Sequence, residues 1–296
     1  MKKLYFLLLI AIVSCSEGTK TLPNSTGSFS EVIFVVEDEL WEESVKEAVA
    51  ETFGASIEGL NKKEANFRVI QVKHAEFKSI LKTHKNIVII ANDVKTSSHK
   101  NKWANVQLVV QLNYKKEGIK NDLNKIKEIF ALEELRGIKN KISRTSQELP
   151  QKNIYQNFKV DVLVPSEYTI IKDTSSFFWG TYNPEKQEII KQILIFSFTP
   201  KTTSLQEEVL QKTDSIFAQY LKGAKQGQHV KIEPQFPPYY TNNIYRGLWK
   251  LEKGFMGGVF LVKTYFINEK IVVAAGLVFD PSSSKRTYLK TFEAIL

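Results

Sequence analysis

The chain has 296 residues, 43% of them hydrophobic, and its 41 basic and 32 acidic side chains give a formal net charge of +9. This length suffices for one large domain or two smaller ones with a real hydrophobic core, so neither a metal nor a disulfide is needed to hold the fold. The only cysteine, Cys15, excludes an intramolecular disulfide and a cysteine-based zinc site.

The chain begins with an apolar segment that is typical of an export signal. Two lysines precede ten apolar residues, 4–13, which are fewer than the roughly 20 needed to cross a bilayer. Residues 12–15, IVSC, resemble the lipobox of bacterial lipoproteins, in which the cysteine thiol receives a diacylglycerol and the chain is cut just before it. We therefore predict a lipoprotein signal peptide at 1–14 and lipidation of Cys15.

An ordinary secretory signal is the alternative, but it would leave Cys15 as a lone reactive thiol in an oxidising compartment. Two or more acyl chains, at about 0.8 kcal/mol per buried methylene, hold a protein stably on a membrane. Residues 15–30 are mostly small and polar and predict a flexible tether. We expect a body anchored to membrane lipid through acylated Cys15 in the bacterial outer membrane. The periplasmic face is favoured over the cell surface because Glu17 is the only acid beside the cysteine.

The basic excess limits the classes of partner. Removal of the signal peptide takes two lysines away and leaves a net charge of about +7, which suits an anionic membrane surface or a glycan. A lysine-rich surface that is simply solvated is the alternative. Nucleic acid is not expected as a partner, because the signal places the protein outside the cytoplasm.

Residues 31–148 predict a first α+β sub-domain, in which strands and helices alternate. Apolar and β-branched runs predict strands at 31–38, 67–72, 86–92 and 106–114. Helical spacing predicts a helix that Asp38 caps and Gly54 ends, a short helix at 75–82, and a long or broken amphipathic helix from Ile119 to Ile142. The first half is therefore predicted to be a mixed α/β layer structure.

A boundary is predicted near residue 150, because residues 143–153 lose the helical periodicity and contain a proline. Residues 155–296 predict a second sub-domain with a largely antiparallel sheet. Its strands are predicted at 158–164, 168–173, 176–182, 188–198, 244–252, 259–267 and 270–279. Its helices are predicted to start at a capping box of Ser204 and Glu207, ending at Gly223, and at Asp280-Pro281 near the C-terminus. The predicted fold class is α+β with two mixed sub-domains and a C-terminal helix.

Several segments in chain order resemble one known family. They are DELW (38–41), LKTHKNIVI (81–89), KWANVQLVV (102–110), VPSEYTIIKD (164–173), EPQFPP (233–238), RGLWKLEKGFMGG (246–258) and RTYLKTFEAIL (286–296). Over nearly its whole mature length the chain resembles a lipoprotein family of Bacteroidota known as domain of unknown function 4837. The resemblance implies an envelope lipoprotein and supplies no catalytic residue. Residues 155–296 also loosely resemble PsbP-type α+β domains in the order of their elements.

Catalytic and metal-binding motifs are sparse. The sequence contains no G-x-S-x-G, no S-x-x-K with its partner motifs and no H-E-x-x-H among its four histidines. A catalytic triad can still assemble from dispersed residues, so a hydrolase stays open. No cofactor and no metal site are expected.

His84 and a group of acidic residues near Asp38 could each take part in catalysis. His84 stands between a predicted helix and a predicted strand, where a loop can aim a side chain into a cleft as a base or ligand contact. Its alternative role is a hydrogen bond to the junction backbone, or plain solvation. Asp38 with Glu39 or Glu42 offers the carboxylate pair that glycosidases need, although acids at a helix start are also favoured by the helix dipole. The sequence thus leaves the enzyme question open and favours a non-catalytic protein.

An aromatic patch at 234–258 is the main candidate contact surface. Tyr240, Arg246, Trp249 and Phe255 are the candidate ligand or partner contacts, since aromatic faces and arginine stack on sugars and anchor partners. The alternative is strand core. In a regular strand Tyr245, Gly247 and Trp249 share one face, and Arg246 and Leu248 share the other.

Three functions follow from these observations. The favoured one is a membrane-tethered envelope lipoprotein that acts as a non-catalytic binding or assembly factor for an envelope protein or glycan. The second is an envelope hydrolase acting on glycan or peptide. The third is a receptor that binds a soluble ligand in a cleft between the two halves.

Overall fold

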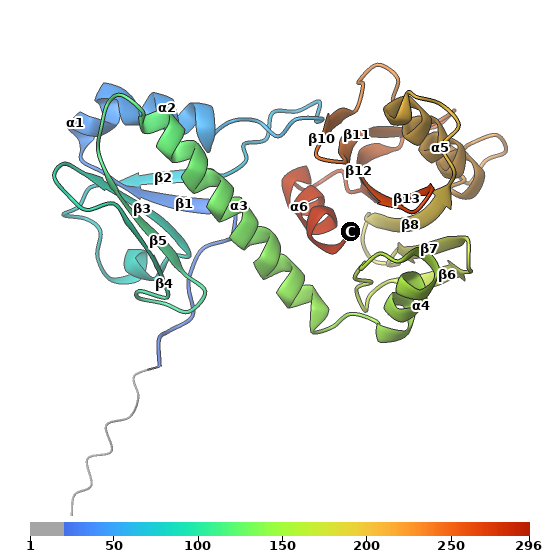
Figure 1. Cartoon of the computed structure of the whole chain (residues 1–296), viewed down its shortest axis with the longest axis horizontal. Helices are drawn as coiled ribbons and strands as arrows, with labels where there is room; N and C mark the ends of the chain where they lie inside the picture. Colours follow the sequence, from blue (N-terminus) through green and yellow to red (C-terminus); the bar gives the residue numbers. More distant parts are fainter. Residues whose placement is uncertain (1–20) are drawn as a thin grey trace, which may run out of the picture.

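The computed structural model describes residues 21–296, which form two halves connected by one long helix, α3 (Ile119–Ser143) (Figure 1). Each half is built on its own β-sheet, so the α+β class predicted from the sequence is confirmed. The predicted signal peptide and Cys15 lie outside the described residues.

The first half contains a five-stranded sheet in the order β2-β1-β3-β5-β4. Its strands are β1 (Glu31–Val35), β2 (Arg68–Val72), β3 (Asn86–Ala91), β4 (Ser97–Lys100) and β5 (Leu108–Asn113). The four strands other than β4 run parallel, and β4 pairs antiparallel with β5. Burial of β1, β3 and β5 on both faces explains why their sequences are almost continuously apolar.

Helices cover one face of this sheet. After β1 the chain forms α1 (Asp38–Leu40), a π-helical turn η1 (Trp41–Val45) and α2 (Lys46–Thr52). The apolar residues of α2 and α3 pack with those of the strands in a single cluster around Phe34, Phe53 and Phe130. The opposite face is covered by the 3₁₀ helix η2 (Ser79–Thr83) and by Phe77 and Trp103.

The second half contains an eight-stranded antiparallel sheet in the order β10-β11-β12-β13-β8-β7-β6, with β9 paired to β11. Its strands are β6 (Thr169–Asp173), β7 (Phe177–Tyr182), β8 (Ile190–Phe198), β9 (Val230–Ile232), β10 (Tyr239–Thr241), β11 (Ile244–Leu251), β12 (Gly257–Ile267) and β13 (Lys270–Phe279). The largely antiparallel second sheet predicted from the sequence is confirmed.

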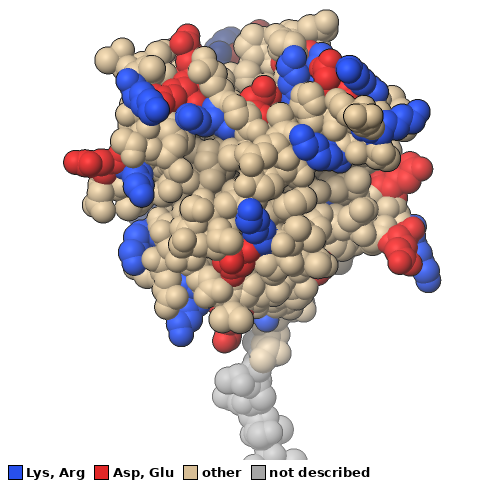
Figure 2. All heavy atoms as spheres, turned by 90° about the vertical axis from the view of Figure 1, so that its right-hand side faces the viewer, with Lys and Arg blue, Asp and Glu red and all other residues tan. Residues whose placement is uncertain are grey.

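The side of the molecule seen in Figure 2 shows no large area of a single charge, because lysine and arginine side chains are interspersed with aspartate and glutamate. The basic excess of the chain is therefore not gathered on this side.

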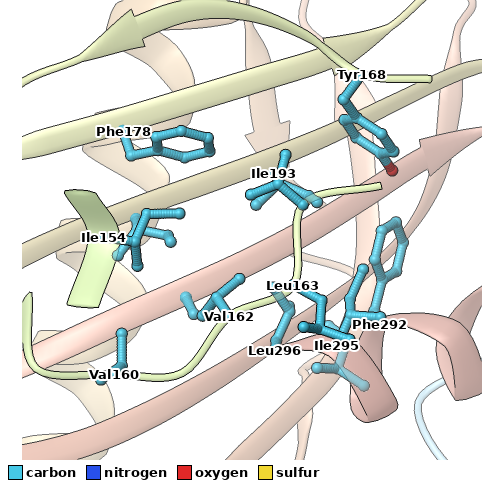
Figure 3. Packing of buried hydrophobic residues seen from close by; sticks show 14 of the residues in the cluster. Ile154, Val160, Val162, Leu163, Tyr168, Phe178, Ile193, Phe292, Ile295 and Leu296 are labelled. Carbon is cyan, nitrogen blue, oxygen red and sulfur yellow. The ribbon is translucent and has the colours of Figure 1, made fainter. Parts of the chain in front are cut away.

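Each face of the second sheet has its own apolar cluster. α5 (Leu205–Tyr220) covers one face. α4 (Glu148–Phe158), α6 (Lys285–Ile295) and the extended segment 159–164 cover the other. Figure 3 shows Leu163 of that segment beside the C-terminal residues Ile295 and Leu296, whereas Val160 lies nearer Ile154 of α4.

The structure corrects two predicted strand and loop assignments beside the boundary. Residues 158–164 do not form the predicted strand. Their apolar side chains alternate, but they bury themselves by lying across the sheet, and the backbone N–H of Leu163 donates to the carbonyl of Ile295 at 2.9 Å. Residues 143–153 are not irregular, because α4 begins at Glu148 and Pro150 lies in its first turn, where a missing N–H costs nothing.

The structure confirms one predicted helix start, because Ser204 is the N-cap of α5, but it corrects the acid of that capping box and the other two starts. Glu37, not Asp38, occupies the first N-cap, and the carboxylate of Asp38 forms an ion pair with Lys73. Glu208, not Glu207, reaches back from α5, and its carboxylate accepts the backbone N–H of Lys201 at 2.9 Å.

The C-terminal helix starts at Lys285, not at Asp280, because the Asp280 carboxylate holds a turn by accepting the backbone N–H groups of Ser282 and Ser283.

Three further predictions of local structure differ from the structure. The predicted helix at 75–82 is a turn followed by η2, and the short strands β4, β9 and β10 were not predicted. The described part of the predicted tether is not free of the body, because Asn24 and Thr26 form bridges with Asn105 and His84. The bridges of Asn24 and Thr26 depend on partners that are distant in sequence, whereas β10 pairs with the adjacent strand β11 in a hairpin.

Candidate functional site

A cavity of about 530 Å³ opens on the α5 face of the second sheet, and we call it the tryptophan pocket. Its aromatic lining consists of Trp179 on β7, Trp249 on β11 and Tyr220 at the end of α5. Met256, in the turn before β12, closes one side. Its aliphatic lining is Ile190, Leu221, Ala224, Val230, Leu251, Leu277 and Val278.

Hydrogen bonds and stacking fix the aromatic side chains of this pocket. The indole N–H of Trp179 donates to Oε1 of Gln192 at 2.7 Å, and that of Trp249 donates to the carbonyl of Val278 at 3.2 Å. The ring of Tyr220 stacks on Phe177 with centroids 4.1 Å apart. Because both indole N–H groups are satisfied within the protein, the rings offer an occupant mainly apolar surface.

The tryptophan pocket has little charge. Lys222 is the one charged residue that lines it, and its ammonium group donates to the carbonyl of Ala218. Asn183 and Gln192 supply the only side-chain amides of the lining. With no carboxylate, histidine or thiol among these lining residues, the pocket is suited to binding an apolar group and offers no acid–base pair.

A second cavity, of about 720 Å³, lies between the two halves, and we call it the interhalf pocket. The first half contributes the loop Leu60–Glu64, and the second half contributes the turns before β12 and after β13. Phe236 and Phe255 line it and are 46% and 97% exposed. Trp249 and Met256 line both cavities, which therefore adjoin each other.

The three carboxylates of the interhalf pocket are all hydrogen-bonded. Glu233 lies 3.3 Å from the ammonium group of Lys250. Burial acts to raise the pKa of Glu64, but hydrogen bonds from Ser284 and the backbone N–H groups after it hold that pKa below its usual value. At Asp280, burial again acts to raise the pKa of the carboxyl group, but hydrogen bonds from Tyr288 and two serines lower it below its usual value. Glu64 and Asp280 are therefore ionised at neutral pH and cannot act as general acids there.

The predicted contact residues of the aromatic patch are divided between several places. Trp249 and Phe255 both line the interhalf pocket, whereas Tyr240 and Arg246 line neither cavity. The ring of Tyr240 packs on Tyr245 with centroids 4.7 Å apart. Arg246 lies on the opposite face of β11 and forms an ion pair of 3.0 Å with Glu293.

The face assignment predicted for β11 is confirmed, because Tyr245 and Trp249 belong to the apolar cluster beneath α5 and Leu248 belongs to the opposite one. Trp249 is only 6% exposed, so most of its ring is core. It contributes an edge to both cavities rather than an exposed stacking face.

His84 lies in the first half, two residues before β3 begins, and lines neither cavity. It is buried, with Nδ1 3.2 Å from the carbonyl of Asn86 and Nε2 4.0 Å from the carboxylate of Glu31. The backbone of Gly27 covers the ring so closely that a Cβ there would stand 2.1 Å from Nε2. Burial lowers the pKa of His84, and the neutral ring serves the junction backbone.

The second half corresponds to a known family. The family model described as domain of unknown function (DUF4837) matches residues 147–296, which is half of the 296-residue chain. The chain belongs to the DUF4837 family. A second model, domain of unknown function (DUF8532), matches residues 25–143. The DUF4837 resemblance was expected over nearly the whole mature length, but that model covers only the second half, and another model matches the first half. No curated protein matches the chain.

The tryptophan pocket lies entirely within the DUF4837 half, and most of its lining was missed by sequence reasoning. Trp179 shares a strand face with Phe177, so alternation alone could have placed it on the α5 side. The strand order that brings Trp179 near Trp249, and the turn that adds Met256, left no signal in the sequence.

The described residues contain neither a cluster of metal-binding side chains nor a helix that could span a membrane. Over residues 21–296, no three histidine, aspartate or glutamate side chains lie close enough together to hold a metal ion. Within the same residues, no helix combines the length and the apolar character needed to cross a bilayer.

Proposed function

We propose that the protein is a membrane-tethered lipoprotein of the cell envelope that acts as a non-catalytic binding or assembly factor. Its DUF4837 half binds an apolar group of a partner in the tryptophan pocket. The observation that carries this proposal is the pocket itself, a cavity of about 530 Å³ lined by two tryptophans and a tyrosine. Binding sites for small apolar groups have this size and composition.

Binding is favoured over hydrolysis by the electrostatics of the two cavities. The tryptophan pocket has no carboxylate in its lining. In the interhalf pocket Glu64 and Asp280 have lowered pKa values, and each accepts several hydrogen bonds from the protein. A glycosidase or peptidase needs a carboxyl group whose pKa is raised toward neutrality, or an activated nucleophile, at the surface of a cleft.

The anchor is proposed from the sequence. The short apolar segment 4–13 and the IVSC motif support lipidation of Cys15 and attachment to the outer membrane, with the body on the periplasmic face. The test is metabolic labelling with palmitate. The wild-type chain is expected to take up label and Cys15→Ala is not, and equal labelling of the two would refute the anchor.

A receptor for a soluble ligand is the second candidate, because the interhalf pocket is larger, at about 720 Å³, and lies between the halves. Its mixed lining of lysines, carboxylates and exposed phenylalanines suits a polar ligand with one apolar part. The two candidates differ in which cavity is occupied. Trp179 lines only the tryptophan pocket, and Phe255 lines only the interhalf pocket.

Titration with anilinonaphthalene sulfonate, an apolar fluorescent anion, separates these candidates. The wild-type protein is expected to show one saturable site. Trp179→Ala is expected to weaken that site about tenfold, equivalent to roughly 1.4 kcal/mol, whereas Phe255→Ala leaves it unchanged. Thermal melting of each variant shows whether it is folded. If only Phe255→Ala weakens the site, the interhalf pocket is the binding site and the tryptophan pocket is not.

A further inference from the structure

Three segments form one surface at the end of the first sheet where β3 and β5 begin, and we call it the tether face: residues 22–26, 79–84 and 101–107. The side-chain amide of Asn105 donates to the carbonyl of Leu22 at 2.7 Å. The side-chain amide of Gln107 donates to the carbonyls of Lys82 and His84 at 2.6 and 2.7 Å. The start of the described chain is thus fixed against this end of the sheet.

Large apolar side chains point into solvent on the tether face. Ile80 is 65% exposed, Val106 is 63% exposed, and Leu22 is 36% exposed. Val106 also has a φ of +58°, a conformation that β-branched residues rarely adopt. The carboxamide oxygen of Asn101 holds it there by accepting its backbone N–H at 2.8 Å. The loop is therefore built so that an unfavourable backbone conformation presents an apolar side chain outward.

The charge of the tether face has one sign. Lys82 and Lys102 are exposed and lie 5.9 and 4.6 Å from the centre of the Trp103 ring. The three segments contain no aspartate or glutamate, in contrast to the mixed charges of the side shown in Figure 2. Exposed aliphatic tips, a tryptophan and lysines together are the composition of surfaces that lie in the headgroup region of an anionic bilayer.

The position of the tether face relative to the anchor is set by chain length. Cys15 stands seven residues before Leu22, and an extended chain of that length spans at most about 25 Å. A lipid on Cys15 therefore keeps this face near the bilayer. In Figure 1 the chain leaves the first half at the lower left, whereas α5, beside the tryptophan pocket, lies at the upper right.

We propose that the tether face is a membrane-contact surface that binds an anionic phospholipid bilayer. Ile80 and Val106 enter the headgroup region, Lys82 and Lys102 contact lipid phosphates, and the tryptophan pocket stays open to solvent. The inference rests on the proposed lipid anchor for its role in the cell. The contact itself is a property of residues 22–107 and can be measured without the anchor.

Flotation with lipid vesicles tests the contact on the chain from residue 16 onward, which contains every described residue. Vesicles of phosphatidylcholine with about one third phosphatidylglycerol are compared with pure phosphatidylcholine. Ile80→Asp/Val106→Asp is expected to reduce the bound fraction on anionic vesicles at least about fivefold. The matched control is Leu149→Asp/Tyr155→Asp, because these apolar residues on α4 are 69% and 59% exposed. It is expected to bind like the wild type.

Two results would overturn the proposal: absence of wild-type binding to anionic vesicles, or equal loss of binding in both double variants. A site-specific probe covers the case in which the aspartate variant fails to fold. The chain from residue 16 has no cysteine, so Val106→Cys and Leu149→Cys each carry one environment-sensitive fluorophore. Anionic vesicles are expected to shift the emission at position 106 to the blue and not at 149, and the reverse pattern contradicts the proposal.

The vesicle experiments and the palmitate labelling test separate proposals, and the result of one does not determine the result of the other. All of the vesicle experiments use chains that lack Cys15, so they do not depend on acylation. Vesicle binding without palmitate labelling would retain the membrane-contact surface and reject the anchor. Palmitate labelling without vesicle binding would retain the anchor and reject the surface.

Discussion

The carboxylate of Glu64, in the first half, accepts the backbone N–H of Arg286 in the first turn of α6 at 2.9 Å. It also accepts the N–H of Lys285 at 2.9 Å and the hydroxyl of Ser284 at 2.6 Å. The guanidinium of Arg286 donates in return to the carbonyl of Ala65 at 3.0 Å. A residue of one half therefore caps a helix of the other, and this contact joins the halves beside the interhalf pocket.

Glu64→Gln is expected to lower the free energy of unfolding by about 1 kcal/mol at neutral pH, since a neutral amide is a poorer cap for a helix N-terminus. The folded pKa of Glu64 is lowered, so its stabilisation is present above the ordinary pKa of 4.5 and is lost as the pH falls through the lowered value. Denaturant unfolding at several pH values measures both effects. The control is Glu58→Gln, on an exposed side chain. Equal stabilities of the two variants would contradict the capping role.

Gly59→Ala is expected to destabilise the junction between the halves. Gly59 has a φ of +89°, and a Cβ there would stand 2.5 Å from the carbonyl oxygen of Arg246. Gly118 has a φ of +99° with no atom within 4 Å of its Cβ position, so Gly118→Ala measures the backbone strain alone. Thermal unfolding should show a larger loss for Gly59→Ala. A loss no greater than that of Gly118→Ala would mean that the halves move apart at little cost.

Glu134→Gln is expected to stabilise the protein at neutral pH, by on the order of 1 kcal/mol, because burial at this position disfavours the ionised carboxylate that the unfolded chain carries. Glu134 is 2% exposed, and one carboxylate oxygen accepts a hydrogen bond from Ser30 while the other has no partner among the described residues. Burial raises the pKa of Glu134, outweighing that hydrogen bond.

The sign of the Glu134 effect follows from its raised pKa. The contribution of the neutral Glu134 carboxyl to the free energy of unfolding is fully present below the ordinary pKa of 4.5. It is lost as the pH rises through the raised pKa of the folded protein. The stability of the wild type relative to Glu134→Gln should therefore fall as the pH rises, in unfolding measurements across that range. A difference that does not change with pH would show that Glu134 keeps the same charge in the folded and unfolded protein.

Trp249→Ala is expected to destabilise the protein by about 3–5 kcal/mol, because the ring is almost entirely core. Trp179→Ala removes a half-buried ring from the same pocket and should cost less. Denaturant unfolding of both variants measures the difference. If Trp249→Ala melts like the wild type, the ring is not part of the core, and it becomes the better position for binding experiments.

The sequence predicted most of this fold where local pattern decides the structure. The alternation along β11 placed Trp249 and Leu248 on opposite faces, and helical spacing located α3 nearly to its ends. The alternating apolar residues at 158–164 did not form the predicted strand. They are buried because the segment packs against the sheet and the C-terminus.

Contacts between distant segments could not be predicted. Glu64 lies more than 200 residues from the helix it caps, and Trp179 joins Trp249 only through the strand order of the second sheet. The exposed Val106 gives no sign in the sequence of its left-handed backbone conformation. The candidate site and the tether face both depend on such contacts, which is why only one residue of the tryptophan pocket was named from the sequence.

Co-purification from gently solubilised envelopes tests the central claim, that the tethered body binds its partner through the tryptophan pocket. The tagged, lipidated protein is compared with Trp179→Ala and Phe255→Ala, each confirmed as folded by its melting transition. The wild type and Phe255→Ala are expected to retain the same component in stoichiometric amount, and Trp179→Ala is expected to lose it. Retention of that component by Trp179→Ala, or its loss from Phe255→Ala alone, would contradict the claim.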